Sequence, residues 1–393
     1  MKAVEQQVKE YDCLLDLLED LDREGITGLQ RQEAYRRFLN LQARMQGVPH
    51  SVGFELTPLC NFDCKMCYVR LSSEQLAKEG SVLSTAQWLK IMEQAVDAGA
   101  MYADITGGEC LTHPGFKELY LYLRSRGVMV GVLTNGQLIT EEMADFFSKH
   151  PPSVIQITIY GSDEDAYEKV TGRRAFADVC AAIERLKQRN IRVFLSVTPS
   201  QYMQKDTHAL ITFLQSTGLS FGIGTGSLPP RENTEKKMAD YLPDSKLYVN
   251  LHLEERAIHA TNNVDVASNE LSNVTRIPKG FQLQGKLTCA AGQSACHINW
   301  KGEMQPCVPF YTVRCSVLDN SFASAWKWTR EQMLRFEPPQ ECMDCPHLTV
   351  CHSCPAERTA GILNGPVNKS ICERCIRYVE AGIVNAQQES PCL

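Results

Sequence analysis

Three cysteines stand close together near the N-terminal end of the chain, at Cys60, Cys64 and Cys67. Three thiolates on one short loop can bind three irons of a 4Fe–4S cluster, which normally takes four cysteine ligands. No fourth cysteine lies within the loop, so one iron would keep an open position, as a catalytic metal site does. A zinc knuckle is the alternative, but zinc typically takes CxxC pairs and four ligands. The spacing CxxxCxxC therefore favours a cluster that can bind a further ligand.

The segments around this loop alternate between short β-rich runs and helical runs. Strands are predicted at 52–57, 101–106, 128–134, 154–160, 192–198 and 220–224. Strand–helix alternation with right-handed crossovers gives a parallel sheet or barrel. Six units are too few to close an eight-stranded barrel, so the predicted fold class is α/β, a partial (β/α)6 TIM-type barrel. In such a barrel the loop after a strand lies on the active-site face, and the cysteine triple follows the first strand directly.

A second short motif, Gly107-Gly108-Glu109, follows the second predicted strand. Paired glycines allow the backbone to approach a ligand closely, and a carboxylate accepts hydrogen bonds from an ammonium group. An ordinary tight turn is the alternative. The next residue, Cys110, is expected to be a small buried side chain, since free cysteine is often buried.

The cysteine triple after the first strand and the Gly-Gly-Glu motif after the second resemble the signature of the radical S-adenosylmethionine (SAM) superfamily. The resemblance implies that the amino and carboxylate groups of SAM bind the open iron. One electron from the cluster would then cleave SAM, and the 5′-deoxyadenosyl radical would take a hydrogen atom from the substrate. The cofactor supplies this chemistry, while the protein positions it. The resemblance therefore implies an enzyme, a radical SAM oxidoreductase.

The same resemblance implies which residues contact SAM. They are Gly107, Gly108 and Glu109 at the amino group, Met66 before the third cysteine, Asn135 in the Thr-Asn-Gly turn, Thr158 at the ribose, and Ser196. Two positions depart from the family pattern. Met66 stands where an aromatic residue often covers the adenine, although a thioether can also cover a ring face. Tyr160 stands where the family often has Asp.

Cysteines become frequent again after residue 288, in a pattern that resembles the SPASM domain of radical SAM maturases. That domain usually binds two auxiliary 4Fe–4S clusters. The resemblance implies a first auxiliary cluster on Cys289, Cys296, Cys307 and Cys354, and a second on Cys342, Cys345, Cys351 and Cys372. Cys375 is an additional thiol that could replace Cys372. Taken alone, the CxxC pairs are typical of a zinc ribbon, but beside a radical SAM barrel we prefer iron–sulfur clusters.

The chain divides into four predicted parts. Residues 1–50 form an N-terminal helical extension, 51–260 the partial barrel, 261–280 a linker and 281–393 the cysteine-rich SPASM domain. The 17 cysteines and the absence of a signal sequence or a long apolar run predict a cytoplasmic protein whose thiols bind metal rather than form disulfides. A net charge of −6 without a basic patch argues against nucleic acid as a partner.

The resemblance covers about residues 50–375 and implies that the substrate is a ribosomally synthesised precursor peptide. The expected change is a crosslink or another C–H functionalisation. A low-potential electron donor of the flavodoxin or ferredoxin type is the expected partner. Either a separate leader-binding protein delivers the peptide, or the enzyme binds it with its own surface. Two alternatives stay open: formylglycine formation, as in anaerobic sulfatase maturases, and a non-catalytic iron–sulfur or zinc scaffold. No residue is identified as a catalytic acid or base.

Overall fold

The computed structural model describes residues 7–203, 207–224, 245–262, 274–348, 351 and 354–381. Six parallel strands form its central sheet, and each pairs with the next one along the chain. They are β2 (Ser51–Glu55), β3 (Tyr102–Thr106), β4 (Met129–Thr134), β5 (Val154–Ile159), β6 (Val193–Val197) and β7 (Ser220–Ile223). The predicted α/β fold class is thus confirmed.

The sheet is open rather than closed into a barrel. Its order is β11-β10-β9-β2-β3-β4-β5-β6-β7. The three further strands come from the C-terminal part: β9 (Ala295–Ile298) runs parallel to β2, whereas β10 (Glu303–Gln305) and β11 (Cys315–Ser316) continue antiparallel. Residues 295–316, which we assigned to the C-terminal domain, therefore extend the barrel sheet. Pairing between segments so far apart leaves no local pattern in the sequence.

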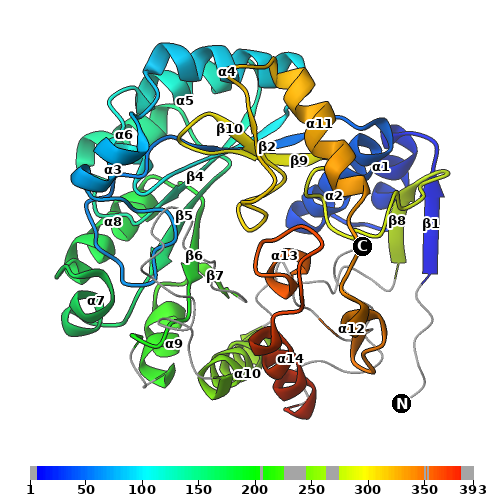
Figure 1. Cartoon of the computed structure of the whole chain (residues 1–393). Coiled ribbons are helices and arrows are strands. Elements are labelled where there is room, and N and C mark those ends of the chain that lie inside the picture. The colour runs from blue at the N-terminus through cyan, green and yellow to red at the C-terminus, as the bar shows by residue number, and fades with distance from the viewer. Residues whose placement is uncertain are drawn as a thin grey trace.

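Six helices cover the outer face of the sheet in chain order (Figure 1). They are α4 (Thr85–Asp97), α5 (Phe116–Ser125), α6 (Glu141–Lys149), α7 (Glu164–Thr171), α8 (Phe176–Gln188) and α9 (Thr207–Ser216). Two of these helices begin at a capping side chain: Ser84 accepts a hydrogen bond from the Gln87 amide, and Thr140 accepts one from the Met143 amide. Such caps satisfy backbone donors that a helix leaves unpaired.

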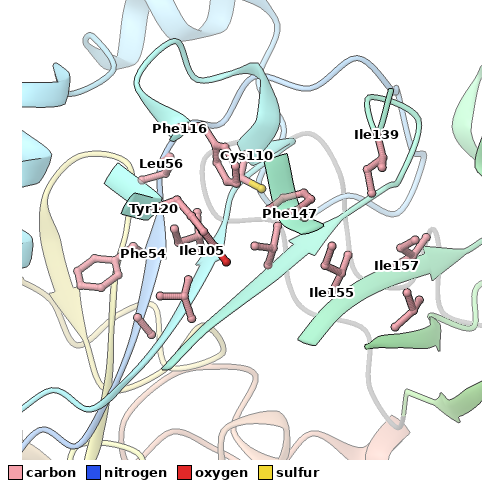
Figure 2. Close-up of a cluster of buried hydrophobic side chains, with 14 of the residues drawn as sticks. Phe54, Leu56, Ile105, Cys110, Phe116, Tyr120, Ile139, Phe147, Ile155 and Ile157 are labelled. Carbon is pink, nitrogen blue, oxygen red and sulfur yellow. The ribbon is translucent and has the colours of Figure 1, made fainter. Parts of the chain in front are cut away.

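The two faces of the sheet differ in burial because side chains alternate along a strand. The face toward the helices is a closed apolar core, in which Phe54 packs edge-to-face on Trp88 (Figure 2 shows part of this cluster). The opposite, inner face is partly accessible. In β5, for example, Ile155 and Ile157 are buried, whereas Gln156 and Thr158 are half-buried. The inner face is therefore the surface on which ligands can reach the strands.

The N-terminal extension contains two helices, but it is not wholly helical as we predicted. The helices are α1 (Leu14–Arg23) and α2 (Gly28–Gln46), and the strand β1 (Gln7–Tyr11) precedes them. This strand pairs in parallel with β8 (Val274–Pro278), which lies in the predicted linker. The sequence did not reveal strand β1 because its pairing partner, β8, is distant in the chain. The linker residues 263–273 lie outside the described residues.

Of the described helices, five come after β7 in the chain (Figure 1). They are α10 (Ser245–Asn262), α11 (Phe322–Leu334), α12 (Gln340–Met343), α13 (Pro355–Arg358) and α14 (Lys369–Glu380), while α3 (Ser73–Glu79) follows the cysteine triple. A buried ion pair between Arg374 and Glu357, 2.8 Å long, joins α14 to α13. Among the described residues, no helix has the length and apolar character needed to span a membrane.

Candidate SAM and iron–sulfur sites

The cysteine triple lies on the loop after β2, and two contacts hold that loop against its neighbours. At the β3 side, the amides of Gly108 and Glu109 donate to the carbonyls of Thr57 and Leu59, at 2.7 and 2.9 Å. A Cβ atom on Gly108 would lie 2.4 Å from the Leu59 carbonyl oxygen, so only glycine permits this approach. The glycines of the Gly-Gly-Glu motif thus bring the β3 loop and the cysteine loop together.

A second contact comes from the C-terminal end of α7. The Asp63 amide donates to the Thr171 carbonyl at 2.8 Å, and the Lys65 amide donates to the Val170 carbonyl at 3.0 Å. The middle of the cysteine loop is therefore fixed by backbone bonds to a helix of the barrel. The sequence offered no sign of this contact.

The three thiols of the loop lie near one another in a desolvated environment. Burial raises the pKa of Cys60 to about 12, and it raises the pKa of Cys64 well above its usual range, with the charge of Cys67 adding to both effects. Backbone amides donate to two of the sulfurs, from Phe62 to Cys60 at 3.3 Å and from Arg70 to Cys67 at 3.2 Å. Buried thiolates that repel one another need a cationic partner, and a metal cluster supplies one.

The donor set of this loop fits an iron–sulfur cluster. It offers three thiols and two backbone donors to sulfur, the type of contact that tunes such clusters. In the part of the chain that the structure describes, no group of three or more His, Cys, Asp or Glu side chains could hold a single metal ion. Thiols that surround a cluster of several irons stand further apart than the ligands of one ion.

Glu109 is fully enclosed and its carboxylate is already occupied by the protein. It accepts hydrogen bonds from the Leu111 amide at 3.1 Å, the Asn135 amide at 2.8 Å and the Thr134 hydroxyl at 2.9 Å. Burial raises the pKa of Glu109, while these donors oppose the rise. A carboxylate can accept about four hydrogen bonds. Glu109 can therefore join the ends of β3 and β4 and still accept a hydrogen bond at the position where SAM is expected.

Asn135 connects the turn after β4 to the cysteine loop. Its side-chain amide donates to the Asn61 side chain at 2.8 Å and lies 3.7 Å from the Cys60 sulfur. Met66 is buried and belongs to the main apolar core. Asn135 thus lies beside the cysteine loop, and Met66 is a buried core residue of that loop; the SAM contact expected for each of them stays a prediction.

The remaining two residues that we expect to contact SAM lie side by side on the inner face. Thr158 of β5 is directly opposite Ser196 of β6, which in turn is opposite Gly222 of β7. Both side chains are half-buried and point to the accessible side of the sheet. Tyr160, just beyond β5, hydrogen-bonds with Cys64 and packs edge-to-face on Phe62, with ring centroids 6.3 Å apart.

The C-terminal thiols form two groups. The first contains Cys289, Cys307 and Cys354, which pack against one apolar cluster that includes Leu287 and Phe310. Burial raises the pKa of Cys307 well above its usual range, and the nearby charges of Cys354 and Cys289 raise it further. These three thiols are therefore neighbours, as expected for a shared metal cluster.

Cys296 does not lie with this first group. It is on β9 opposite Val52 of β2, so its side chain points into the core beneath the outer helices. Burial alone raises its pKa, with no contribution from another thiol. The allocation of Cys296 to the first auxiliary cluster thus disagrees with its placement. Strand alternation decides which way it points, and the sequence did not reveal that residues 295–298 join the barrel sheet.

The second group holds five thiols rather than the four we assigned. They are Cys342, Cys345, Cys351, Cys372 and Cys375. Cys372 and Cys375 lie one turn apart on α14, and both interact with Cys351. Arg358 donates to the Cys351 carbonyl at 3.0 Å and its positive charge favours the thiolate of Cys342. The structure therefore brings both Cys372 and Cys375 to this group.

Comparison with known proteins agrees with this arrangement. Residues 54–212, from β2 into α9, match the family model of the radical SAM superfamily. This match, together with the relatives described below, indicates an enzyme of the radical SAM type, which uses SAM and a 4Fe–4S cluster. An enzyme is thereby indicated over the non-catalytic scaffold.

Two relatives resemble most of the chain. The antilisterial bacteriocin subtilosin biosynthesis protein AlbA of Bacillus subtilis is 23% identical over 367 residues, which are 87% of this chain and 75% of AlbA. The AdoMet-dependent heme synthase of Methanosarcina barkeri is 23% identical over 334 residues, 80% of this chain and 94% of that protein. The crystal structure of Streptococcus suis SuiB bound to precursor peptide SuiA shares the fold, with a TM-score of 0.62, 14% identity and coverage of 91% and 87%.

Proposed function

We propose that this enzyme modifies a ribosomally synthesised peptide by radical chemistry, forming a crosslink or another product of C–H functionalisation. The observation that carries the proposal is the similarity to a bacteriocin biosynthesis protein over 87% of this chain. The SuiB complex supports it, because a protein of the same fold binds a precursor peptide. The accessible inner face of the sheet offers a surface for such a substrate.

The residues described above take specific roles in this proposal. Cys60, Cys64 and Cys67 would hold the 4Fe–4S cluster, which together with SAM would supply the radical chemistry. Thr158 and Ser196 contact SAM from the inner face. Glu109 positions the β3 and β4 loops by accepting hydrogen bonds from three donors, so its effect on SAM includes the placement of neighbouring backbone groups.

The C-terminal thiol groups bind auxiliary clusters in the same proposal. The first group supplies Cys289, Cys307 and Cys354, and the second supplies four of its five thiols. A low-potential flavodoxin- or ferredoxin-type protein donates the electron that starts the reaction, and the peptide is bound either by a separate leader-binding protein or by the enzyme's own surface. The proposed location of the reaction is the cytoplasm.

The test combines metal analysis with peptide modification. Anaerobic reconstitution should yield about 12 iron per chain for three 4Fe–4S clusters. The wild-type enzyme with SAM and a reductant should produce 5′-deoxyadenosine and should change the mass of a short precursor peptide encoded beside it. The Cys64→Ala variant should do neither, because it lacks a cluster ligand.

The same experiment separates the rival substrates. A sulfatase-derived peptide that gains formylglycine, while precursor peptides stay unchanged, would show a sulfatase maturase. Conversion of a tetrapyrrole instead of any peptide would place the enzyme beside the heme synthases, which it resembles at the same 23% identity. Either result would overturn the peptide proposal while leaving the radical SAM class intact.

A further inference from the structure

Asp104 occupies an unusual place on the inner face of β3. At its level in the sheet the neighbouring strands carry glycine on both sides, Gly53 of β2 and Gly131 of β4. A Cβ on Gly131 would lie 2.4 Å from the Asp104 Oδ1 atom, and a Cβ on Gly53 would lie 2.5 Å from Nδ1 of His297. The two glycines therefore leave room for polar side chains to lie across the sheet.

The Asp104 carboxylate is accessible to solvent, although its strand has neighbours on both sides. Surrounding protein still desolvates it, which raises the pKa of Asp104. Across the residues that the structure describes, no hydrogen bond reaches this carboxylate. Glu109, only a few residues later, shows the opposite arrangement, with both of its oxygens occupied. A carboxylate that opens to solvent on the accessible face of the sheet, with no hydrogen bond from the described residues, can accept hydrogen bonds from a ligand that binds there.

The surroundings of Asp104 favour a positively charged ligand. Glu55 of β2 lies on the same inner face, and its Oε2 atom is 3.3 Å from Nε2 of His297. Arg36 of α2 is near enough to lower the pKa of Asp104, as His297 does, but its guanidinium is paired with Glu33 at 3.2 Å. Asp104 and the Glu55–His297 pair thus lie on the same part of the sheet, where a cation bound at Asp104 would be attracted by its carboxylate.

The position of Asp104 along its strand suits a substrate contact. It lies three residues before Gly107, which is about 10 Å along an extended strand. A peptide whose reacting carbon lies near SAM could therefore place a neighbouring side chain beside Asp104. Resting on the proposed function, we infer that Asp104 binds an ammonium or guanidinium group of the peptide substrate.

The first test needs no substrate and uses the reconstituted enzyme. Asp104→Asn removes the charge at nearly constant size, and Glu93→Gln, exposed on α4, is the matched control. The Tm of Asp104→Asn should equal or exceed that of the control, because an unpaired carboxylate has been removed. Methylguanidinium chloride should raise the Tm of the wild type more than that of Asp104→Asn at the same ionic strength. A lower Tm, or equal shifts in both proteins, would show that Asp104 is structural.

The second test uses the peptide that the wild-type enzyme modifies. Asp104→Asn should bind it about ten- to hundredfold more weakly, the effect of losing a charged hydrogen bond. Neutralising one particular Lys or Arg of the peptide should weaken binding to the wild type and leave binding to Asp104→Asn unchanged. Additive losses would overturn the inference. If the wild type modifies no peptide, the proposed function fails, while the first test still decides whether Asp104 binds cations.

Discussion

At the scale of single residues, cysteines of similar appearance in the sequence have different surroundings in the fold. Cys307 lies beside two other thiols, whereas Cys296 packs among apolar side chains of the barrel core. Metal binding needs several donors on one side of a site, so the neighbours of a cysteine decide its role more than its spacing does.

We therefore predict opposite effects for two substitutions. Cys307→Ala should lower the iron content by about four per chain, the content of one cluster, because the first group loses a ligand. Cys296→Ala should retain the full iron content and cost only the stability of a small cavity in the core. Iron and sulfide analysis of the reconstituted variants measures both. Equal iron losses in the two variants would show that Cys296 is a ligand of the first auxiliary cluster.

Glu109→Gln tests the structural part of that residue's role. The amide nitrogen of glutamine cannot accept hydrogen bonds, so the Asn135 amide or the Thr134 hydroxyl would lose its acceptor. We expect a loss of about 1–3 kcal/mol in the free energy of unfolding. Denaturant unfolding under anaerobic conditions measures it, with Glu93→Gln as the exposed control. Unchanged stability would mean that Glu109 serves SAM alone.

At the scale of elements, the cysteine loop is placed by the turn after β3 and by the end of α7 rather than by its own residues. The contact at Gly108 is the closest of these, since Cβ atoms cannot fit there. The Gly-Gly-Glu motif thus holds two loops close together, in addition to its expected contact with SAM.

Gly108→Ala should therefore displace the cysteine loop and reduce the iron bound by Cys60, Cys64 and Cys67. Gly218→Ala is a suitable control, because that glycine has a positive φ of 68° with no atom within 4 Å of its added Cβ. The control should lose about 1 kcal/mol of stability and keep its iron. The 5′-deoxyadenosine yield and the iron content distinguish the two variants. An unchanged iron content in Gly108→Ala would show that the cysteine loop still binds its cluster despite the added Cβ atom.

At the scale of the whole molecule, the N-terminal helices and the C-terminal part are joined through Arg44 of α2. Its buried guanidinium donates to the Gln293 side chain at 2.9 Å and to the Thr288 carbonyl at 3.1 Å, just before Cys289. The N-terminal extension thereby supports the segment that leads into the first auxiliary thiol group. This connection gives the N-terminal extension a structural role beside the first auxiliary thiol group.

Arg44→Met should keep most of the side-chain volume but remove these donors. We expect a loss of about 1.5–3 kcal/mol in stability, since hydrogen bonds from charged groups are lost. The first auxiliary cluster should also become less stable to chelators than the cluster at Cys60 to Cys67. Thermal unfolding and iron release in the presence of a chelator measure the two effects. Equal rates of iron release from all clusters would show that Arg44 does not stabilise the first auxiliary cluster in particular.

The sequence by itself determined the chemistry and the order of the elements. The cysteine triple, the Gly-Gly-Glu motif and six strand–helix units are all local patterns, because ligand spacing and side-chain periodicity act over a few residues. The position of Ser84 as a helix cap is local in the same way.

Only the tertiary structure decided which distant segments meet. It paired β1 with β8, added β9 to the barrel sheet, turned Cys296 into the core and placed Asp104 between two glycines. None of these follows from local periodicity, because strand pairing and burial depend on contacts between residues far apart in the chain, and a shift of one residue in a strand reverses the face of every side chain.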